Sequence, residues 1–421
     1  MKENRFNLFI AGDAIITLPW SHIANPEFLA LVDLMRAADV TIINLETVVH
    51  SFRGYAQADS GGTWVASPPV IAEELAWAGV NMVSHANNHA FDYGSEGILE
   101  THEHVAESGI VITGSGKDLQ SARAPGWFTA KRQKVAHLSV AATFVPYGRA
   151  SRSRPDLRGR PGINPLTVVD RSVVGIPEWF KTFMRVTDKL LGNDQTKYAR
   201  PRYIRFEKQF VVGDGFCLVR GRRLDKGDRA ATIEAVAQAS EQADLTVVSI
   251  HSHDESAWLH AYVRDVVEAG ANVVHVHGVH EVRGIKLING CAIFYGLGDF
   301  VFQVVQISPL PAQAYEAVGL DDAATPADLV EVTKTWAQSF QPKIFEGCAA
   351  QLNYDLGRLK SVALYPIDLQ FGANNTDLGR PQLANPKLGK RIIEEIASQS
   401  SQFGTKVRYD AGTNTGRIDV F

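Results

Sequence analysis

The residues able to do chemistry in this sequence stand directly after short apolar runs. Asp13, Glu46 and His251 each follow such a run. Runs of this length, rich in β-branched residues, predict β-strands. In an open α/β sheet, ligands collect in the crevice beyond the carboxyl ends of the strands. We therefore expect these side chains to converge at one edge of a sheet.

Further donors occupy equivalent positions after other predicted strands. The complete set of predicted metal ligands is Asp13, Glu46, Asn88, His251, His277 and His280. Carboxylate, carboxamide and imidazole donors without thiolates suit divalent ions such as Mn, Fe or Zn. His253 and His275 are close enough in sequence to complete the same shells, and the sequence leaves that choice open.

Each of these residues also has a structural interpretation. A single Asp after a strand is most often a turn residue or a helix cap, and a single buried His is more often hydrogen-bonded in the core than bound to metal. We assign that structural role to His22, His50, His102, His104, His137 and His260. The occurrence of donors at five strand ends along the chain favours the metal interpretation.

Apolar runs and segments with helical spacing alternate along most of the chain, which is typical of α/β architecture. Strands are predicted at residues 7–11, 40–43, 80–84, 110–113, 245–250, 272–276, 285–288, 292–295, 348–354 and 359–366. Helices are predicted at residues 26–38, 70–78, 96–108, 229–243, 258–269 and 386–399.

Composition narrows the class of protein. The chain has 421 residues with 42 Lys+Arg and 46 Asp+Glu, a net charge of −4. This balance excludes a strongly basic nucleic-acid-binding protein. Three widely spaced cysteines form no disulfide framework and no zinc signature. With no leader-like segment and no long apolar run, we expect a cytoplasmic protein without a membrane or nucleic-acid partner.

The length allows one large domain with insertions. We predict a single domain over residues 1–421, with an insertion at 148–212 and a C-terminal extension at 309–421. The insertion begins with an arginine-rich loop. Its arginines either contact an anionic substrate through bidentate hydrogen bonds or belong to a solvated surface loop. The substrate we expect is a small or oligomeric anion.

Several motifs resemble one known family. They are Gly12-Asp13, Asn44-Leu45-Glu46-Thr47, the block from Ala86 to Gly94 that reads ANNHAFDYG, and Phe294-Tyr295-Gly296-Leu297-Gly298-Asp299-Phe300. Together they resemble the poly-γ-glutamate capsule synthesis family of CapA/PgsA type. The resemblance covers about residues 6–147 and 229–404, and its Asn-Asn-His block is the most specific part.

This resemblance implies the fold and site of a calcineurin-like metallophosphatase. The implied fold is a four-layer α-β-β-α sandwich of two mixed sheets. The implied site holds two metal ions, with Asp13 on one, Glu46 bridging both and Asn88 on the second. His89 would be a catalytic group facing the substrate, oriented by Asp92. Trp20, Trp64, His253 and Glu255 are predicted to contact the substrate.

The implied chemistry is hydrolysis. Paired cations lower the pKa of a bound water and act as Lewis acids, and a histidine can protonate the leaving group. The bond would be an amide, ester or phosphoester, with a γ-glutamyl amide suggested by the family. The alternative is a non-catalytic polymer-handling component of capsule synthesis. A third hypothesis, a signalling phosphatase, shares the metal centre. Two departures stand out: Ile15 replaces a histidine common in metallophosphatases, and Asp299 replaces an Asn.

Overall fold

The computed structural model describes residues 5–177, 179–180, 182–183, 186, 209–212, 217–307, 309–339 and 342–420. It divides into two compact units, one of Met1–Pro165 with Ala230–Phe421 and one of Leu166–Arg229. Residues 187–208 of the predicted insertion lie outside the described residues. The assignment of one domain with an insertion at 148–212 stays a prediction.

The larger unit contains a mixed sheet with the strand order β22-β23-β20-β19-β1-β2-β5-β6, to which β18 and β21 add by pairing with β1 and β20. Its strands are β1 (Arg5–Ile15), β2 (Val40–Leu45), β5 (Met82–Ser84), β6 (Val111–Thr113), β18 (Asp299–Phe302), β19 (Glu346–Asp355), β20 (Arg358–Asp368), β21 (Gln382–Leu383), β22 (Arg408–Asp410) and β23 (Thr415–Asp419). β1 runs parallel to β2 and β18 and antiparallel to β19.

A second mixed sheet has the order β16-β17-β15-β14-β9-β8. It consists of β8 (Gly126–Ala130), β9 (Gln133–Ala141), β14 (Leu245–His251), β15 (Val273–His277), β16 (Ile285–Ile288) and β17 (Cys291–Phe294). Short ladders join β3 (Val48–Val49) to β4 (Ala66–Ser67) and β7 (Ser115–Gly116) to β10 (Gly162–Ile163). The smaller unit holds β11 (Val168–Ile176), β12 (Gln209–Val212) and β13 (Cys217–Leu224).

Sequence signals place the helix ends. The Asn25 side chain accepts a hydrogen bond from the Phe28 N–H at the start of α1, and Asn385 caps α10 in the same way. Proline follows each cap at the first helical position, where its missing N–H costs nothing. The helices are α1 (Pro26–Ala37), α2 (Val70–Trp77), α3 (Gly94–Glu107), α4 (Leu119–Arg123), α6 (Lys226–Ser240), α7 (Ala257–Glu268), α8 (Ala312–Glu316), α9 (Pro326–Ser339) and α10 (Pro386–Ser401).

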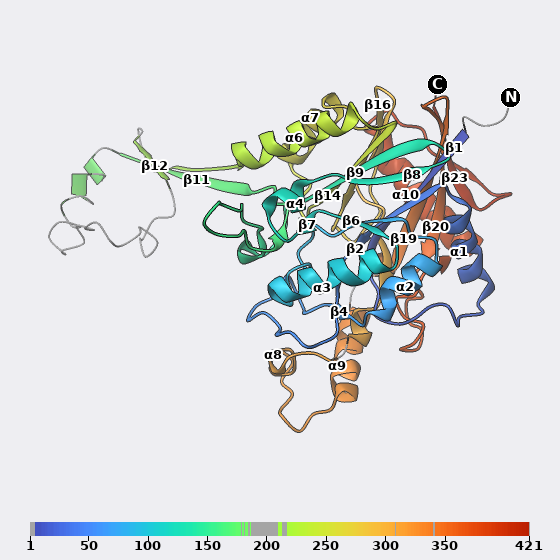
Figure 1. Ribbon diagram of the computed structural model, residues 1–421, viewed down its shortest axis with the longest axis horizontal. Coiled ribbons are helices and arrows are strands. Elements are labelled where there is room, and N and C mark those ends of the chain that lie inside the picture. Colours follow the sequence, from blue (N-terminus) through green and yellow to red (C-terminus); the bar gives the residue numbers. More distant parts are fainter. Residues whose placement is uncertain are drawn as a thin grey trace. The chain divides into compact units, whose positions relative to one another are not determined.

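The two sheets pack face to face, with helices outside both. Alternation along β1 sends Leu8 and Ile10 into a core shared with Val247 of β14, while Phe9 faces a second core built with α1 and α2. Figure 1 shows α7 on the outer side of the smaller sheet and α1 to α3 on the outer side of the larger one. The predicted four-layer α-β-β-α fold is confirmed.

Among the described helices, none has both the length and the apolar content needed to cross a membrane.

Candidate metal centre

The carboxyl ends of four strands bring the predicted donors together. Asp13 lies near the end of β1, Glu46 directly follows β2, and His251 and His277 are the last residues of β14 and β15. The register pairs His251 with His277 across the parallel ladder. His280 joins the group from the turn after β15, since its ring reaches Asp13. The structure thus gathers donors separated by more than 200 residues of sequence at one edge.

Short distances connect these side chains. His277 Nδ1 lies 3.2 Å from Asp13 Oδ1 and 3.0 Å from His251 Nδ1. On its other side, His251 Nε2 lies 3.9 Å from Glu46 Oε1. Three sets of donor atoms fall within 4.8 Å of one another: Asp13 with His251 and His277, Glu46 with His251 and His253, and Asp13 with His280 and Asp299. This spacing suits shared coordination of cations.

An asparagine that the sequence analysis did not single out holds the two acids in place. Asn44 Nδ2 donates to Asp13 Oδ1 at 2.7 Å and to Glu46 Oε2 at 3.1 Å. Asn87 Nδ2 in turn donates to Asn44 Oδ1 at 3.3 Å. The Asn44 amide therefore joins the two carboxylates. Glu46 keeps Oε1 on the side of His251, whereas Asp13 Oδ2 accepts the Gly278 N–H at 2.9 Å. In the sequence Asn44 stood out only as the first residue of the Asn44-Leu45-Glu46-Thr47 motif, which did not indicate this role.

The acids and imidazoles perturb one another strongly. Burial, reinforced by the negative charge of Asp13, raises the pKa of Glu46 well above its usual value. Burial also opposes ionisation of Asp13, but the hydrogen bond and positive charge of His277 outweigh it and hold the pKa of Asp13 well below its usual value. Burial lowers the pKa of His251, which favours the neutral ring that a metal requires.

Several donor atoms of the predicted ligands and of Asp299 have no hydrogen-bond partner in the described part of the chain. They are Glu46 Oε1, Asn88 Oδ1, His251 Nε2 and Asp299 Oδ2, all on buried residues. Leaving a buried polar atom unpaired costs about 1–3 kcal/mol, and the cost recurs here four times. All four are lone-pair donors of the kind that bind a divalent cation, so the residues present fit a metal centre.

His89 is held by Asp92. His89 Nδ1 lies 2.8 Å from Asp92 Oδ2, which also accepts the Val65 N–H at 2.8 Å. Burial raises the pKa of Asp92, and the charge and hydrogen bond of His89 oppose that shift. Nearby, Asn88 Nδ2 donates to the Gly61 carbonyl at 2.9 Å. The loop through Gly61 therefore orients both the predicted ligand and the predicted catalytic pair.

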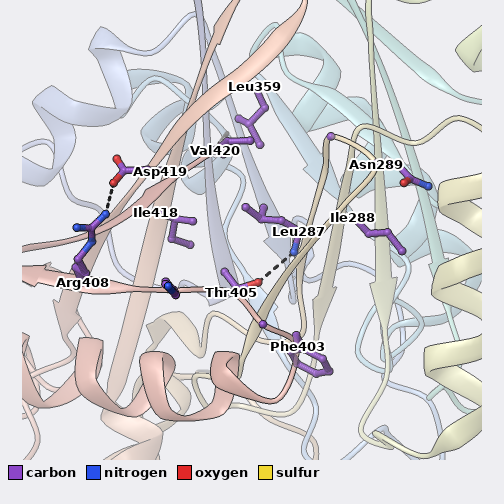
Figure 2. A pocket seen from close by; sticks show the side chains of 13 residues that line it. Leu287, Ile288, Asn289, Leu359, Phe403, Thr405, Arg408, Ile418, Asp419 and Val420 are labelled. Atoms are coloured by element: carbon purple, nitrogen blue, oxygen red, sulfur yellow. Dashed lines mark hydrogen bonds and ion pairs between the residues drawn. The ribbon is translucent and has the colours of Figure 1, made fainter.

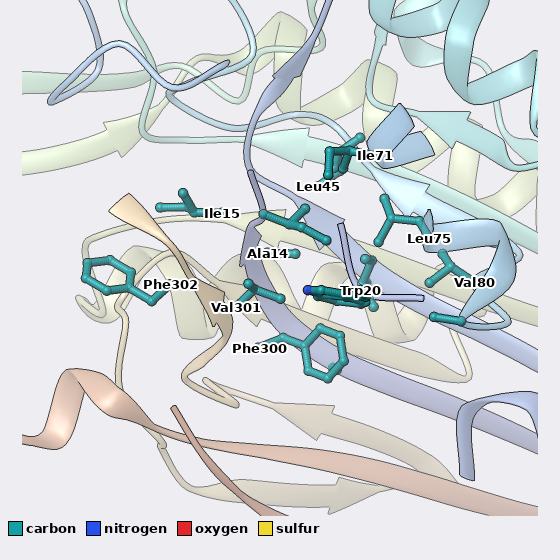
Figure 3. Close-up of a cluster of buried hydrophobic side chains, with 14 of the residues drawn as sticks. Ala14, Ile15, Trp20, Leu45, Ile71, Leu75, Val80, Phe300, Val301 and Phe302 are labelled. Carbon is teal, nitrogen blue, oxygen red and sulfur yellow. The ribbon is translucent and has the colours of Figure 1, made fainter. Parts of the chain in front are cut away.

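The predicted substrate residues do not form one group. Trp20 is fully buried in the apolar core, where a substrate cannot reach it. Its indole makes edge contacts with Phe28 and with Phe300, and Figure 3 shows it beside Phe300. Trp64 donates through Nε1 to the Gln57 carbonyl at 2.7 Å, within the loop that leads to Val65. His253 is exposed and stacks edge-on against His251, with ring centres 5.2 Å apart.

The remaining predicted residues are Glu255, expected to contact the substrate, and His275, an alternative metal ligand. Glu255 is exposed and lies 3.8 Å from the Arg283 guanidinium, measured from Oε2 to Nε. His275, the alternative ligand, is buried beside His277, and neither of its ring nitrogens has a partner among the described residues.

The chain also matches a known protein family. Residues 7–304 match the family model described as bacterial capsule synthesis protein PGA_cap. The chain belongs to this family. The matched segment includes β1 through β18 and hence every donor described above.

Relatives of this PGA_cap protein span a range of similarity. An uncharacterized protein of Sinorhizobium fredii is 30% identical over 96% of this chain and 91% of its own length. A probable polyglutamine synthesis accessory protein of Mycobacterium tuberculosis is 25% identical over 67% of this chain and 59% of its own. The PGA biosynthesis protein CapA of Bacillus subtilis is 23% identical over 64% of this chain and 54% of its own length.

Among solved structures, a novel phosphatase from Mycoplasma pneumoniae has a TM-score of 0.39 and 11% identity, covering 87% of this chain and 94% of its own. A TM-score this low does not support a fold assignment by itself. The fold assignment of the PGA_cap protein rests on its own strand order and layers.

A separate cavity of about 460 Å³ lies away from the donors. It is lined by the β16–β17 turn at Asn289 and Gly290 and by residues such as Thr405 and Arg408 of the C-terminal segment (Figure 2). Because Val273 at the start of β15 pairs with Ala292 at the start of β17, this turn lies at the edge of the sheet opposite His277. No predicted site residue lines the cavity.

Proposed function

We propose that this PGA_cap protein is a metal-dependent hydrolase with a centre for two divalent cations. The observation that carries the proposal is the set of buried lone-pair donors with no hydrogen-bond partner in the described chain. Asp13 would bind one cation, Glu46 both and Asn88 the second, with His251, His277 and His280 completing the shells. When bound, paired cations supply Lewis acidity and a water that ionises near neutral pH.

His89 supplies the proton transfer in this proposal. Its Nδ1 is fixed by Asp92 at 2.8 Å, so Nε2 is the nitrogen available to donate. Gly62 faces that side of the ring: a Cβ at residue 62 would lie 3.8 Å from His89 Nε2. The absence of a side chain there keeps the ring edge clear. A protonated His89 can then donate to the leaving atom or to the developing oxyanion.

The proposed substrate is an anionic polymer or fragment with a γ-glutamyl amide bond, because relatives are named for polyglutamine synthesis and PGA biosynthesis. The arginine-rich loop supports an anionic substrate. Tyr147 in that loop packs against Phe91, with ring centres 6.2 Å apart, and its hydroxyl donates to the Asp59 carbonyl at 2.5 Å. Arg152 and Arg158 of the same loop are exposed. Their charge lies on a loop attached to the His89 segment.

The proposed location is the cytoplasm. Cys291 and Cys348 are buried free thiols, as a reducing compartment allows.

The test is a substrate panel. Protein loaded with Mn²⁺ would be assayed on a γ-glutamyl anilide, a nitrophenyl ester and a bis-nitrophenyl phosphate, in parallel with His89→Ala. We expect turnover of one class that requires added metal and falls in the variant. Absence of metal-dependent turnover on all three substrates would refute the proposal that the protein is a hydrolase.

The names of the relatives favour one alternative, a non-catalytic component that handles the polymer during synthesis, since one of them is called an accessory protein. Binding of poly-γ-glutamate oligomers, measured by calorimetry with no cleavage of the recovered polymer, would select this alternative over the hydrolase.

A further inference from the structure

Two glycine–aspartate pairs meet in this fold. β1 and β18 are parallel neighbours, and Asp13 pairs in register with Asp299. The glycine before Asp13 permits the close approach, because a Cβ on Gly12 would lie 1.8 Å from the Gly298 carbonyl oxygen. Both carboxylates therefore leave adjacent strands at the same level, although they are far apart in sequence.

His280 lies between these two acids. Its Nδ1 is 2.7 Å from Asp299 Oδ1 and 3.8 Å from Asp13 Oδ2. The residue has φ +54°, in the left-handed region that costs a non-glycine residue about 1–2 kcal/mol. Such strain persists where the surroundings demand it, and it concentrates at functional sites. Here it places the imidazole against both carboxylates.

The second oxygen of Asp299 has no protein partner. Asp299 is fully buried, and its Oδ2 makes no hydrogen bond within the described chain. An asparagine at this position could also accept a hydrogen bond from His280, but its other terminal atom would be an NH₂ group, which cannot bind a cation. The aspartate instead presents a lone-pair oxygen without a hydrogen-bond partner among the described residues.

The buried negative charges around Asp299 also favour a bound cation. Asp13, Glu46 and Asp299 are each no more than 1% exposed. In the described parts of the chain they form ion pairs with histidines alone. Burying charges without full compensation costs several kcal/mol per ion. Bound cations would supply the missing positive charge.

We propose that Asp299 is a metal ligand that forms, with Asp13 and His280, a three-residue site for one divalent cation. Donor atoms of these three residues lie within 4.8 Å of one another. The set shares no residue with Glu46, His251 and His253, which form a second group. Two carboxylates and one imidazole make a harder donor set than an imidazole-rich one, so this site favours Mn²⁺ over Zn²⁺ relative to its neighbour. The inference rests on the proposed metal centre and adds a ligand to it.

The test compares Asp299→Asn with wild type and with Asp39→Asn after chelator treatment, each titrated with Mn²⁺ in a calorimeter. Asp39 is a suitable control, because its buried carboxylate accepts the Asn7 N–H at 2.8 Å at the opposite end of β1. We expect Asp299→Asn to lose one binding event or weaken it about tenfold or more. Asp39→Asn should bind as wild type does. Wild-type affinity and stoichiometry in Asp299→Asn would overturn the inference.

The outcomes separate this inference from the proposed function. A wild type that binds no Mn²⁺ refutes the metal centre itself, whereas two binding events in both wild type and Asp299→Asn refute only the added ligand. Asp299→Glu guards against a purely structural effect, since it keeps the carboxylate. Recovery of the event in Asp299→Glu supports ligation, and equal loss in both variants, with unfolding in thermal melts, contradicts it.

Discussion

Two groups of buried histidines differ in how their nitrogens are satisfied. In the first, at the strand ends, His251 Nε2 has no hydrogen-bond partner among the described residues. In the second, His137 Nδ1 lies 3.2 Å from the Thr113 hydroxyl and Nε2 2.9 Å from the Ser249 hydroxyl. His85 likewise contacts Ser115 through Nδ1 and the Thr47 carbonyl through Nε2.

This contrast shows that burial alone does not identify a site. Burial lowers the pKa of His137 and of His85 to about 3, and it also lowers that of His251. All three rings are therefore favoured in the neutral form. What separates them is the partner: protein hydroxyls and a carbonyl complete the second group, whereas the first has donor atoms left over for a ligand. The predictions below test that distinction.

The largest effect is expected for Glu46→Gln. Glu46 Oε1 is a buried oxygen without a hydrogen-bond partner in the described chain, and the amide would supply a weaker metal ligand without charge. We expect most of the bound metal, about two ions in wild type, and nearly all activity to be lost. Elemental analysis of the purified proteins measures this.

Glu74→Gln is the matched control. Glu74 is also buried, but its carboxylate accepts from Trp20 N, Ser21 N and Ser21 Oγ at 2.7–2.9 Å. It should lose stability while keeping its metal. Metal content that falls equally in both variants would show that partner satisfaction does not separate the two kinds of site.

His89→Ala comes next. His89 belongs to the strand-end region but is assigned to proton transfer, so the variant should keep its metals while turnover falls roughly a hundredfold. His102→Ala serves as the control, because the His102 ring contacts the Ser115 hydroxyl at 2.8 Å and has no part in the proposed reaction. Steady-state kinetics and metal analysis on the same samples decide the matter. Loss of metal in His89→Ala would show that His89 is a metal ligand and not the proton donor.

Much of this architecture could be predicted from local sequence. The strand expected at residues 285–288 coincides with β16, and the helix expected at 386–399 begins with α10 and ends two residues before it. Apolar runs and capping residues carry this information locally. The hairpin of β8 and β9 and the short strand β18 were not predicted. β18 has only four residues, and its pairing with β1 is what makes it a strand.

The candidate site was likewise predicted only in part from the sequence. Donors that directly follow a strand, such as Asp13 and His251, could be predicted because topology alone brings strand ends together. Asp299 and Asn44 were not in the predicted ligand set, since their roles depend on the register between distant strands. Trp20 was expected to contact the substrate but fills the core between α1 and β18, because its indole packs against Phe28 and Phe300.

A smaller effect is expected for Gly278→Ala. Gly278 has φ +102°, and a Cβ there would lie 2.8 Å from His251 Cε1, so the substitution strains the backbone and displaces a predicted ligand. We expect metal affinity to fall about tenfold. Gly109→Ala isolates the backbone cost, because Gly109 has φ +78° and open space around it. It should lose about 1 kcal/mol of stability and keep its metal. Equal metal affinity in both would mean that His251 is not a ligand.

The smallest effect is expected for the pH dependence of stability through His137, whose two ring nitrogens both have protein partners. His137 in the folded protein has a pKa of about 3 because of burial, against about 6.5 when unfolded. Below pH 6.5 the unfolded chain therefore binds a proton that the folded chain does not, and stability falls as pH falls. His137→Gln removes this contribution, so its urea-unfolding free energy in chelator should drop by roughly 1–2 kcal/mol less than that of wild type between pH 6.5 and 5.0. Metal content at pH 7 should be unchanged. An unaltered pH slope would show that His137 is protonated in the fold, and loss of metal would move it into the ligand group.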